Sequence, residues 1–180
     1  TSIFSHTSHR RFFGLGYSLI ITPLSCKLWP LPAMLLETPV PSELDQLLKK
    51  IRACRICDQH LPLGPRAVLQ ASGSAKLMII GQAPGTKVHE SGVPWDDASG
   101  KRLRHWLEMD ADQFYDDSCV AIVPMGFCYP GRNPKGGDMP PRPECAPKWH
   151  SRVLDLLPNV ELTLLVGGYA QAHYLHDRSS

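Results

Sequence analysis

The chain has 180 residues, 43% of them hydrophobic and 20% charged, with a formal net charge of +2. That length accommodates one domain with a sizeable core and excludes two full-sized domains. Three of the 19 basic residues and none of the 17 acidic residues lie in residues 1–33, which leaves 16 basic against 17 acidic side chains in the rest. Any contact with nucleic acid must therefore come from a local basic patch.

The first 33 residues differ in character from the rest of the chain. A basic start is followed by a short apolar run that Gly and Pro interrupt, which is similar to a signal peptide but too short to span a bilayer. Met34 opens a more regular stretch. We therefore expect residues 1–33 to be an unstructured N-terminal extension, and residues 34–180 to form one domain of a cytoplasmic protein.

The remaining pattern alternates helices and strands. In chain order we expect a helix from Glu43 capped by Ser42, a strand at 77–80, a tight turn, a long loop, a helix capped by Ser99, a strand at 119–125, a helix at 147–157, a strand at 162–168 and a final helix from Tyr169. Strands separated by helices predict an α/β fold with a doubly wound, mostly parallel sheet.

Four of the six cysteines have spacing that suits a metal centre. Cys54 and Cys57 form a C-x-x-C pair, and Cys128 and Cys145 flank a loop that is rich in Pro and Gly and poor in apolar residues. A cluster or a zinc ion on these four thiolates would fasten the beginning of the chain to its middle. The alternative is four reduced thiols without a metal. Cys119 begins a strand, and we expect it in the core.

The segment "GQAPGTKVHESGVPWDDASGKRLRHWL" resembles the first motif of the uracil-DNA glycosylase superfamily, most closely that of its iron-sulfur members, family 4. That motif runs Gly-Glu-Ala-Pro-Gly, a loop ending in Gly-x-Pro-Phe, a turn of small residues and an Arg-Leu-Leu helix. The four cysteines are also similar to the family's layout, and the resemblance covers roughly residues 44–175. It implies a three-layer fold and a 4Fe-4S cluster on those cysteines, with zinc as the alternative.

The resemblance also implies a binding site for a uracil extruded from DNA. The turn after the first strand of the domain would hold the base, with backbone amides around Gln82 and Ala83 facing a uracil carbonyl where negative charge develops. Trp95 takes the place of the family's Phe and would stack on the base, although a core aromatic is the alternative. The implied substrate-binding residues are Gly81, Gln82, Ala83, Pro84, Gly85 and Trp95.

The sequence departs from the family at two places. Gln82 replaces the family's Glu, and an amide cannot act as a general base at neutral pH. The nearby carboxylates of Asp96 and Asp97 could take that part, so the catalytic candidates are Gln82, Asp96 and Asp97. The alternative for the two Asp residues is a solvated start of a helix. The family's later His-Pro-Ser motif does not occur, from which we expect a C-terminally truncated domain with doubtful activity. We expect His89 at the surface.

Two groups of basic residues could contact phosphate. Lys101, Arg102 and Arg104 lie near a helix N-terminus, and Arg132 lies in the cysteine-flanked loop. Both groups could equally be solvated faces. The function that we expect is a monomeric DNA repair enzyme, without a membrane partner, that hydrolyses the N-glycosidic bond of uracil in DNA during base excision repair. The alternative is a non-catalytic nucleobase or nucleic-acid-binding module with a structural zinc site on its four cysteines.

Overall fold

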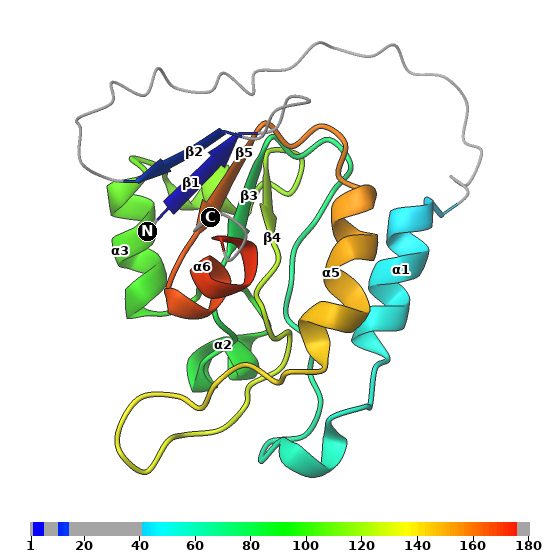
Figure 1. Ribbon diagram of the computed structural model, residues 1–180, viewed down its shortest axis with the longest axis vertical. Coiled ribbons are helices and arrows are strands. Elements are labelled where there is room, and N and C mark those ends of the chain that lie inside the picture. Colours follow the sequence, from blue (N-terminus) through cyan, green and yellow to red (C-terminus); the bar gives the residue numbers. More distant parts are fainter. Residues whose placement is uncertain (1, 6–10, 15–40, 176–180) are drawn as a thin grey trace.

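The computed structural model describes residues 2–5, 11–14 and 41–175 (Figure 1). At its centre lies a five-stranded sheet in the order β2-β1-β5-β3-β4. Strands β3 (Leu77–Ile80), β4 (Val120–Ile122) and β5 (Leu162–Leu165) run parallel. The expected strand at 77–80 is therefore confirmed residue for residue, and the parallel centre of the sheet confirms the predicted fold class.

Two short strands extend the sheet beyond β5. β1 (Ser2–Ser5) pairs antiparallel with β5, and β2 (Arg11–Gly14) pairs antiparallel with β1. These segments differ from the expectation that residues 1–33 are unstructured. A physical reason is the edge of β5, whose backbone groups need hydrogen-bonding partners that another strand can supply. The remaining residues of the expected extension lie outside the described residues.

Helices cover both faces of the sheet, which makes the fold three-layered (Figure 1). On one face lie α1 (Glu43–Arg52), α5 (Cys145–Asp155) and α6 (Gly168–Leu175), and on the other lie α3 (Ala98–Trp106) and α4 (Ala111–Tyr115). The short helix α2 (Thr86–Ser91) and the 3-10 helix η1 (Asp58–His60) were not predicted. No helix of the described residues has both the length and the apolar character needed to cross a bilayer.

The alternation of side chains along β3 builds the two cores. Met78 and Ile80 pack into the apolar cluster beneath α1 and α5, whereas Leu77 and Ile79 pack into the cluster beneath α3 and α4. Successive residues of a strand point to opposite faces, so four consecutive apolar residues are what a strand covered on both sides requires. Burial on both faces holds β3 in place, and the turn at 81–85 follows it directly.

Local signals explain where α1 begins. The Ser42 hydroxyl accepts a hydrogen bond from the Asp45 backbone N–H at 3.1 Å, and the Asp45 carboxylate accepts one from the Ser42 N–H at 3.0 Å. This reciprocal capping box satisfies two backbone donors that a helix start leaves without partners. The predicted Ser42 cap is confirmed.

A buried histidine joins three elements behind the carboxyl end of the sheet. His150 of α5 has its Nε2 3.0 Å from the Pro124 carbonyl oxygen and its Nδ1 2.6 Å from the Tyr174 hydroxyl of α6. Because a carbonyl only accepts, Nε2 carries the proton and Nδ1 accepts from the tyrosine. Burial lowers the pKa of His150 from 6.5 to about 4, so the ring is neutral at physiological pH.

Candidate active site

The turn from Gly81 to Gly85 stands at the carboxyl end of β3, where parallel sheets bind ligands. The segment after β4 holds it in place: the Met125 N–H donates to the Gly81 carbonyl at 2.9 Å and the Gly126 N–H donates to the Gln82 carbonyl at 3.0 Å. Within the described part of the chain, the N–H groups of Gln82 and Ala83 donate to no backbone carbonyl. The turn therefore presents free donors on a fixed backbone, as an anionic or carbonyl ligand requires.

Trp95 lies over the first residue of this turn. A Cβ built on Gly81 would stand 2.8 Å from Cζ2 of the indole, so only glycine allows the ring to approach so closely. Trp95 has a φ of 59°, which a bulky residue rarely adopts, and a Cβ on Gly100 would lie 1.7 Å from the Trp95 carbonyl oxygen. Such backbone outliers persist where the surroundings hold them, often at functional sites.

The ring of Trp95 is only partly buried and packs at the edge of the cluster beneath α3 and α4. It is therefore neither a fully buried core residue nor a free surface one. The alternative of core packing therefore describes part of its environment, and stacking on a base stays a prediction.

The three predicted catalytic side chains differ in how the fold engages them. Asp97, and not the expected Ser99, caps α3: its Oδ1 accepts from the Gly100 N–H at 2.8 Å and from the Ser99 hydroxyl at 2.6 Å. One carboxylate oxygen of Asp97 thus serves the start of a helix, which was the alternative to a catalytic role. Its Oδ2 lies 4.0 Å from the position of a Cβ on Gly85, and so faces the turn. Asp96 is exposed.

The third candidate, Gln82, bridges to the cysteine-flanked loop. Its Nε2 donates to the Met139 carbonyl at 3.1 Å. The loop residues 131–139 form a hairpin in which the Met139 N–H donates to the Gly131 carbonyl at 2.8 Å. In Figure 1 the loop between β4 and α5, drawn in yellow, runs beside α2 at one end of the molecule. Gln82 therefore anchors this hairpin to the turn.

The hairpin brings a carboxylate to the turn that the sequence analysis did not consider. Asp138 Oδ2 lies 3.3 Å from the position of a Cβ on Gly85, closer than Asp97 Oδ2 at 4.0 Å. Nothing local in the sequence distinguishes Asp138 from other loop acids, because its place depends on the hairpin pairing of Arg132 with Asp138. Carboxylates from two separate segments thus reach the end of the turn.

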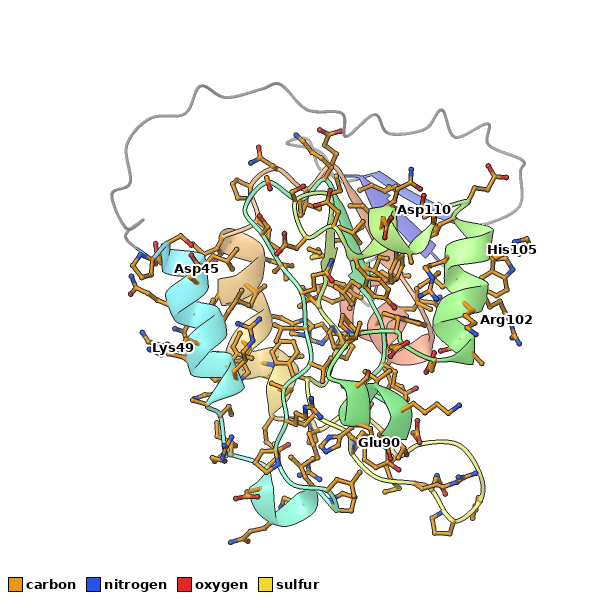
Figure 2. The ribbon with its side chains drawn as sticks, turned by 180° about the vertical axis from the view of Figure 1, so that it is seen from behind. Asp45, Lys49, Glu90, Arg102, His105 and Asp110 are labelled. Carbon is orange, nitrogen blue, oxygen red and sulfur yellow. The ribbon has the colours of Figure 1, made fainter. Side chains whose placement is uncertain are left out.

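His89 of α2 is buried, with 9% of its surface exposed, so the expectation of a surface histidine is wrong. Among the residues that the structure describes, its Nδ1 has no hydrogen-bond partner, and its ring centroid lies 6.2 Å from that of Tyr129. The physical reason for the burial is that α2 packs onto the residues after β4. Arg66 closes the C-terminal end of α2 by donating to the His89 carbonyl and, at 2.8 Å, to the Glu90 carbonyl. Figure 2 shows Glu90 on this helix.

The predicted phosphate contacts separate into two kinds. Lys101 and Arg102 of α3 are exposed, and Arg102 points outward in Figure 2. Arg132 of the hairpin is exposed as well. Arg104 turns inward instead, donating to the Tyr115 hydroxyl at 3.0 Å and covering the Phe114 ring at 5.5 Å from its centroid. Its guanidinium is thus engaged within the fold, while the other three remain available to an anion.

The fold gathers the four predicted metal ligands around one cavity of about 20 Å³. Cys54, Cys57, Cys128 and Cys145 all line it, and all four are free thiols. They come from three segments: the end of α1 with the loop behind it, the residues after β4, and the start of α5. Cys119 lies apart, packed at the edge of the cluster beneath α3 and α4.

The thiols influence one another, which shows how near they lie. Burial raises the pKa of Cys145 to about 12, and the charges that Cys128, Cys57 and Cys54 would carry raise it further. Burial likewise raises the pKa of Cys128, with Cys54 and Cys57 adding to the effect. A bound cation would reverse this preference, because it deprotonates the thiols that coordinate it.

The donor set fits both groups that the sequence suggested, because four thiolates are typical ligands of zinc and of iron-sulfur clusters. The side-chain positions are looser than a metal site requires: within the described residues no three Cys, His, Asp or Glu side chains are arranged to hold an ion. The cavity also has room for only about one water molecule. Either group would therefore require the thiols to take up other positions.

One comparison with known proteins bears on this arrangement. The model of a protein family described as the uracil DNA glycosylase superfamily matches residues 70–179, which is more than half of the chain. The matched range contains β3, the turn, Trp95, the hairpin and the last two predicted cysteine ligands, whereas Cys54 and Cys57 lie before it.

Proposed function

Because the chain belongs to the uracil-DNA glycosylase superfamily, we propose that it hydrolyses the N-glycosidic bond of uracil in DNA and leaves an abasic site. The observation that carries this proposal is the turn at Gly81 to Gly85, which combines free backbone donors with an aromatic ring lying over it. A base inside a duplex is inaccessible to such a turn, so the substrate is a nucleotide that is flipped out or already single-stranded.

The turn would act on the leaving base. Negative charge develops on the uracil ring as its bond to the sugar breaks, and the Gln82 and Ala83 N–H groups would stabilise that charge. The Gln82 side chain is already used to anchor the hairpin through the Met139 carbonyl. We therefore assign Gln82 to binding and shaping the site, with its backbone N–H as its contribution to the chemistry.

Trp95 would hold the base against the turn. The ring lies over Gly81 and is only partly buried. Stacking on an aromatic side chain accepts any base, so specificity for uracil must come from the turn and its donors. Phosphates on either side of the flipped nucleotide would contact Lys101 and Arg102 on α3 and Arg132 on the hairpin, all of which are exposed.

The resemblance to the iron-sulfur members supports a 4Fe-4S cluster on Cys54, Cys57, Cys128 and Cys145, which line one cavity. When bound, the cluster would supply structural cross-linking of three chain segments. Cys128 lies at the start of the loop that carries the hairpin, and Cys145 lies at its end. Fastening both ends would steady the Gln82 contact and the carboxylates at Gly85. We further propose that the protein acts as a cytoplasmic monomer.

The experiment is incubation of the purified chain with an oligonucleotide that contains one uracil, followed by chromatography of the released base. Release of free uracil, with none from the matching thymine oligonucleotide, is the expected result. Binding of the oligonucleotide without release of uracil would instead establish the nucleobase-binding module. Failure to bind would contradict both functions.

A further inference from the structure

The proposed reaction needs a group to take a proton from the attacking water, and the turn itself offers none. Gln82 is an amide without basic character, and Ala83 and Pro84 have no titratable side chain. A group outside the turn must therefore face it. Because the turn is fixed by β3 and by the Met125 and Gly126 N–H groups, the candidates can be found from their distances to it.

Two carboxylates meet this condition at Gly85. Asp138 Oδ2 lies 3.3 Å and Asp97 Oδ2 lies 4.0 Å from the position of a Cβ on that glycine. Asp97 already has a structural task, since its other oxygen caps α3 through the Gly100 N–H and the Ser99 hydroxyl. Asp138 makes no side-chain hydrogen bond in the described part of the structure, so both of its carboxylate oxygens remain available to a water molecule.

The position of Asp138 is built into the backbone. Its hairpin is closed by the Met139 N–H to the Gly131 carbonyl at 2.8 Å, by the Asn133 N–H to the Gly137 carbonyl at 2.9 Å and by the pairing of Arg132 with Asp138. The residue after Asp138 is then tied to the turn through the Gln82 side chain. Gln82 thus fixes the very segment that delivers the carboxylate. A Glu at position 82 would lack the N–H that makes this contact.

A second, independent observation is a buried polar atom near this turn. His89 is nine-tenths buried, yet its Nδ1 has no hydrogen-bond partner among the described residues. Its backbone N–H donates to the Gly85 carbonyl at 2.9 Å, which places it one helical turn from the residue that the two carboxylates face. A buried polar atom without a partner is costly, and a bound base or water would remove that cost.

We propose that Asp138 is a catalytic residue that orients the attacking water and accepts its proton; this rests on the glycosylase function proposed above. A lone pair of the water oxygen forms the bond to C1′ of the deoxyribose, and the C1′–N1 bond breaks with its electron pair going to uracil. The water proton passes to the Asp138 carboxylate and from there to the uracil anion or to solvent. The products are uracil and the abasic sugar with a hydroxyl at C1′.

The test is single-turnover cleavage of a single-stranded oligonucleotide with one uracil, with protein in excess, by the full chain and by its Asp138→Asn variant. Affinity is measured separately with the 2′-fluoro analogue of the uracil nucleotide, whose glycosidic bond resists cleavage. General acid–base catalysis contributes about a hundredfold to ten-thousandfold, so the rate should fall by at least about a hundredfold while affinity stays within about twofold. Asp138→Glu, which keeps the carboxylate, should retain more activity than Asp138→Asn.

The matched control is Asp112→Asn, which removes an exposed carboxylate from α4 and should leave the rate unchanged. Melting temperatures of all variants exclude loss of folding as the cause. If the full chain cleaves and Asp138→Asn cleaves equally fast, or if rate and affinity fall by the same factor, Asp138 is not the base although the glycosylase function stands. If the full chain binds the oligonucleotide but does not release uracil, the proposed function itself is wrong.

Discussion

The indole ring of Trp95 lies against Gly81 so closely that a methyl group on the glycine would come within 2.8 Å of Cζ2. Real Cβ atoms do not approach other atoms so closely, so a methyl group at this position would force the ring to shift. Gly81 and Trp95 therefore form one continuous surface. Substitution of either residue tests this contact.

Gly81→Ala should displace the ring without removing it. The Gly81 carbonyl accepts the Met125 N–H, and that bond does not depend on the side chain, so the turn should keep its backbone path. Overpacking costs about 1 to 3 kcal/mol, which should appear as a lower melting temperature and a changed tryptophan fluorescence spectrum. Uracil-oligonucleotide affinity should fall as well. An unchanged affinity would mean that the ring does not form part of the binding surface.

Trp95→Ala should weaken the binding of a uracil oligonucleotide by up to roughly a hundredfold, because stacking on one aromatic ring contributes about 1 to 3 kcal/mol. The control is Trp95→Phe, which keeps an aromatic face and should retain most of the affinity. Fluorescence anisotropy gives the affinities, and melting temperatures report the packing. If the alanine variant loses stability but binds as before, Trp95 is a packing residue only.

Much of the fold could be predicted from short stretches of the sequence. The strand at 77–80 and the Ser42 cap of α1 were predicted correctly because each depends on neighbours in sequence: a run of apolar residues between polar ones, and a serine followed by helical spacing. The cap of α3 was predicted two residues late, at Ser99, whereas the structure has it at Asp97. Asp and Ser both commonly cap helices, so the sequence did not decide between these residues, and only the hydrogen bonds identify Asp97.

The parts that were missed depend on tertiary structure. Helix α2 has six residues, and Val88 is the only apolar one among them. The segment therefore lacks the helical spacing of apolar residues from which a helix could be predicted. His89 is buried because of where α2 packs, and its sequence neighbours do not indicate that. Asp138 reaches Gly85 only through the hairpin and the Gln82 contact. A single sequence gives no means of knowing which acid of a polar loop lies near a turn more than fifty residues earlier.

If the four cysteines bind a cluster, Cys128→Ser should lose visible absorbance, iron and sulfide together, and should lower the melting temperature. The reason is that three segments meet at this cavity, so removing one ligand releases the cross-link. Cys119→Ser is the control for metal content, since Cys119 lies outside the cavity. Equal iron content in both variants would overturn the ligand assignment, and zinc in place of iron would identify the alternative centre.

Stability should fall on acidification because of His150. Burial lowers its pKa in the folded state to about 4, below the value of 6.5 for an unperturbed histidine, so protons bind the unfolded chain first. The stabilising contribution is complete above about pH 6.5 and is lost as the pH falls toward about 4, amounting to about 2 kcal/mol by pH 5. Urea unfolding at pH 7.5 and pH 5 measures it.

The control for this pH dependence is His150→Gln, which has no group that titrates in that range. Its free energy of unfolding should be lower at pH 7.5 but should change less between the two pH values. Glu144 does not interfere, because its salt bridge to Arg142 at 2.6 Å lowers its pKa from 4.5 to about 2 and its contribution is lost only below pH 4.5. A pH dependence of equal size in both proteins would assign the effect to other groups.

The mass of the DNA strand after incubation with the chain shows most directly whether this protein cleaves the glycosidic bond. A single-stranded oligonucleotide with one uracil is treated with excess protein, and intact-mass spectrometry is performed before any heating or alkali. We expect a product that has lost one uracil and gained one hydroxyl group, at the uracil position alone, while a strand with thymine at that position stays intact. A uracil strand that binds the protein and keeps its original mass would contradict the central claim that this site cleaves the glycosidic bond.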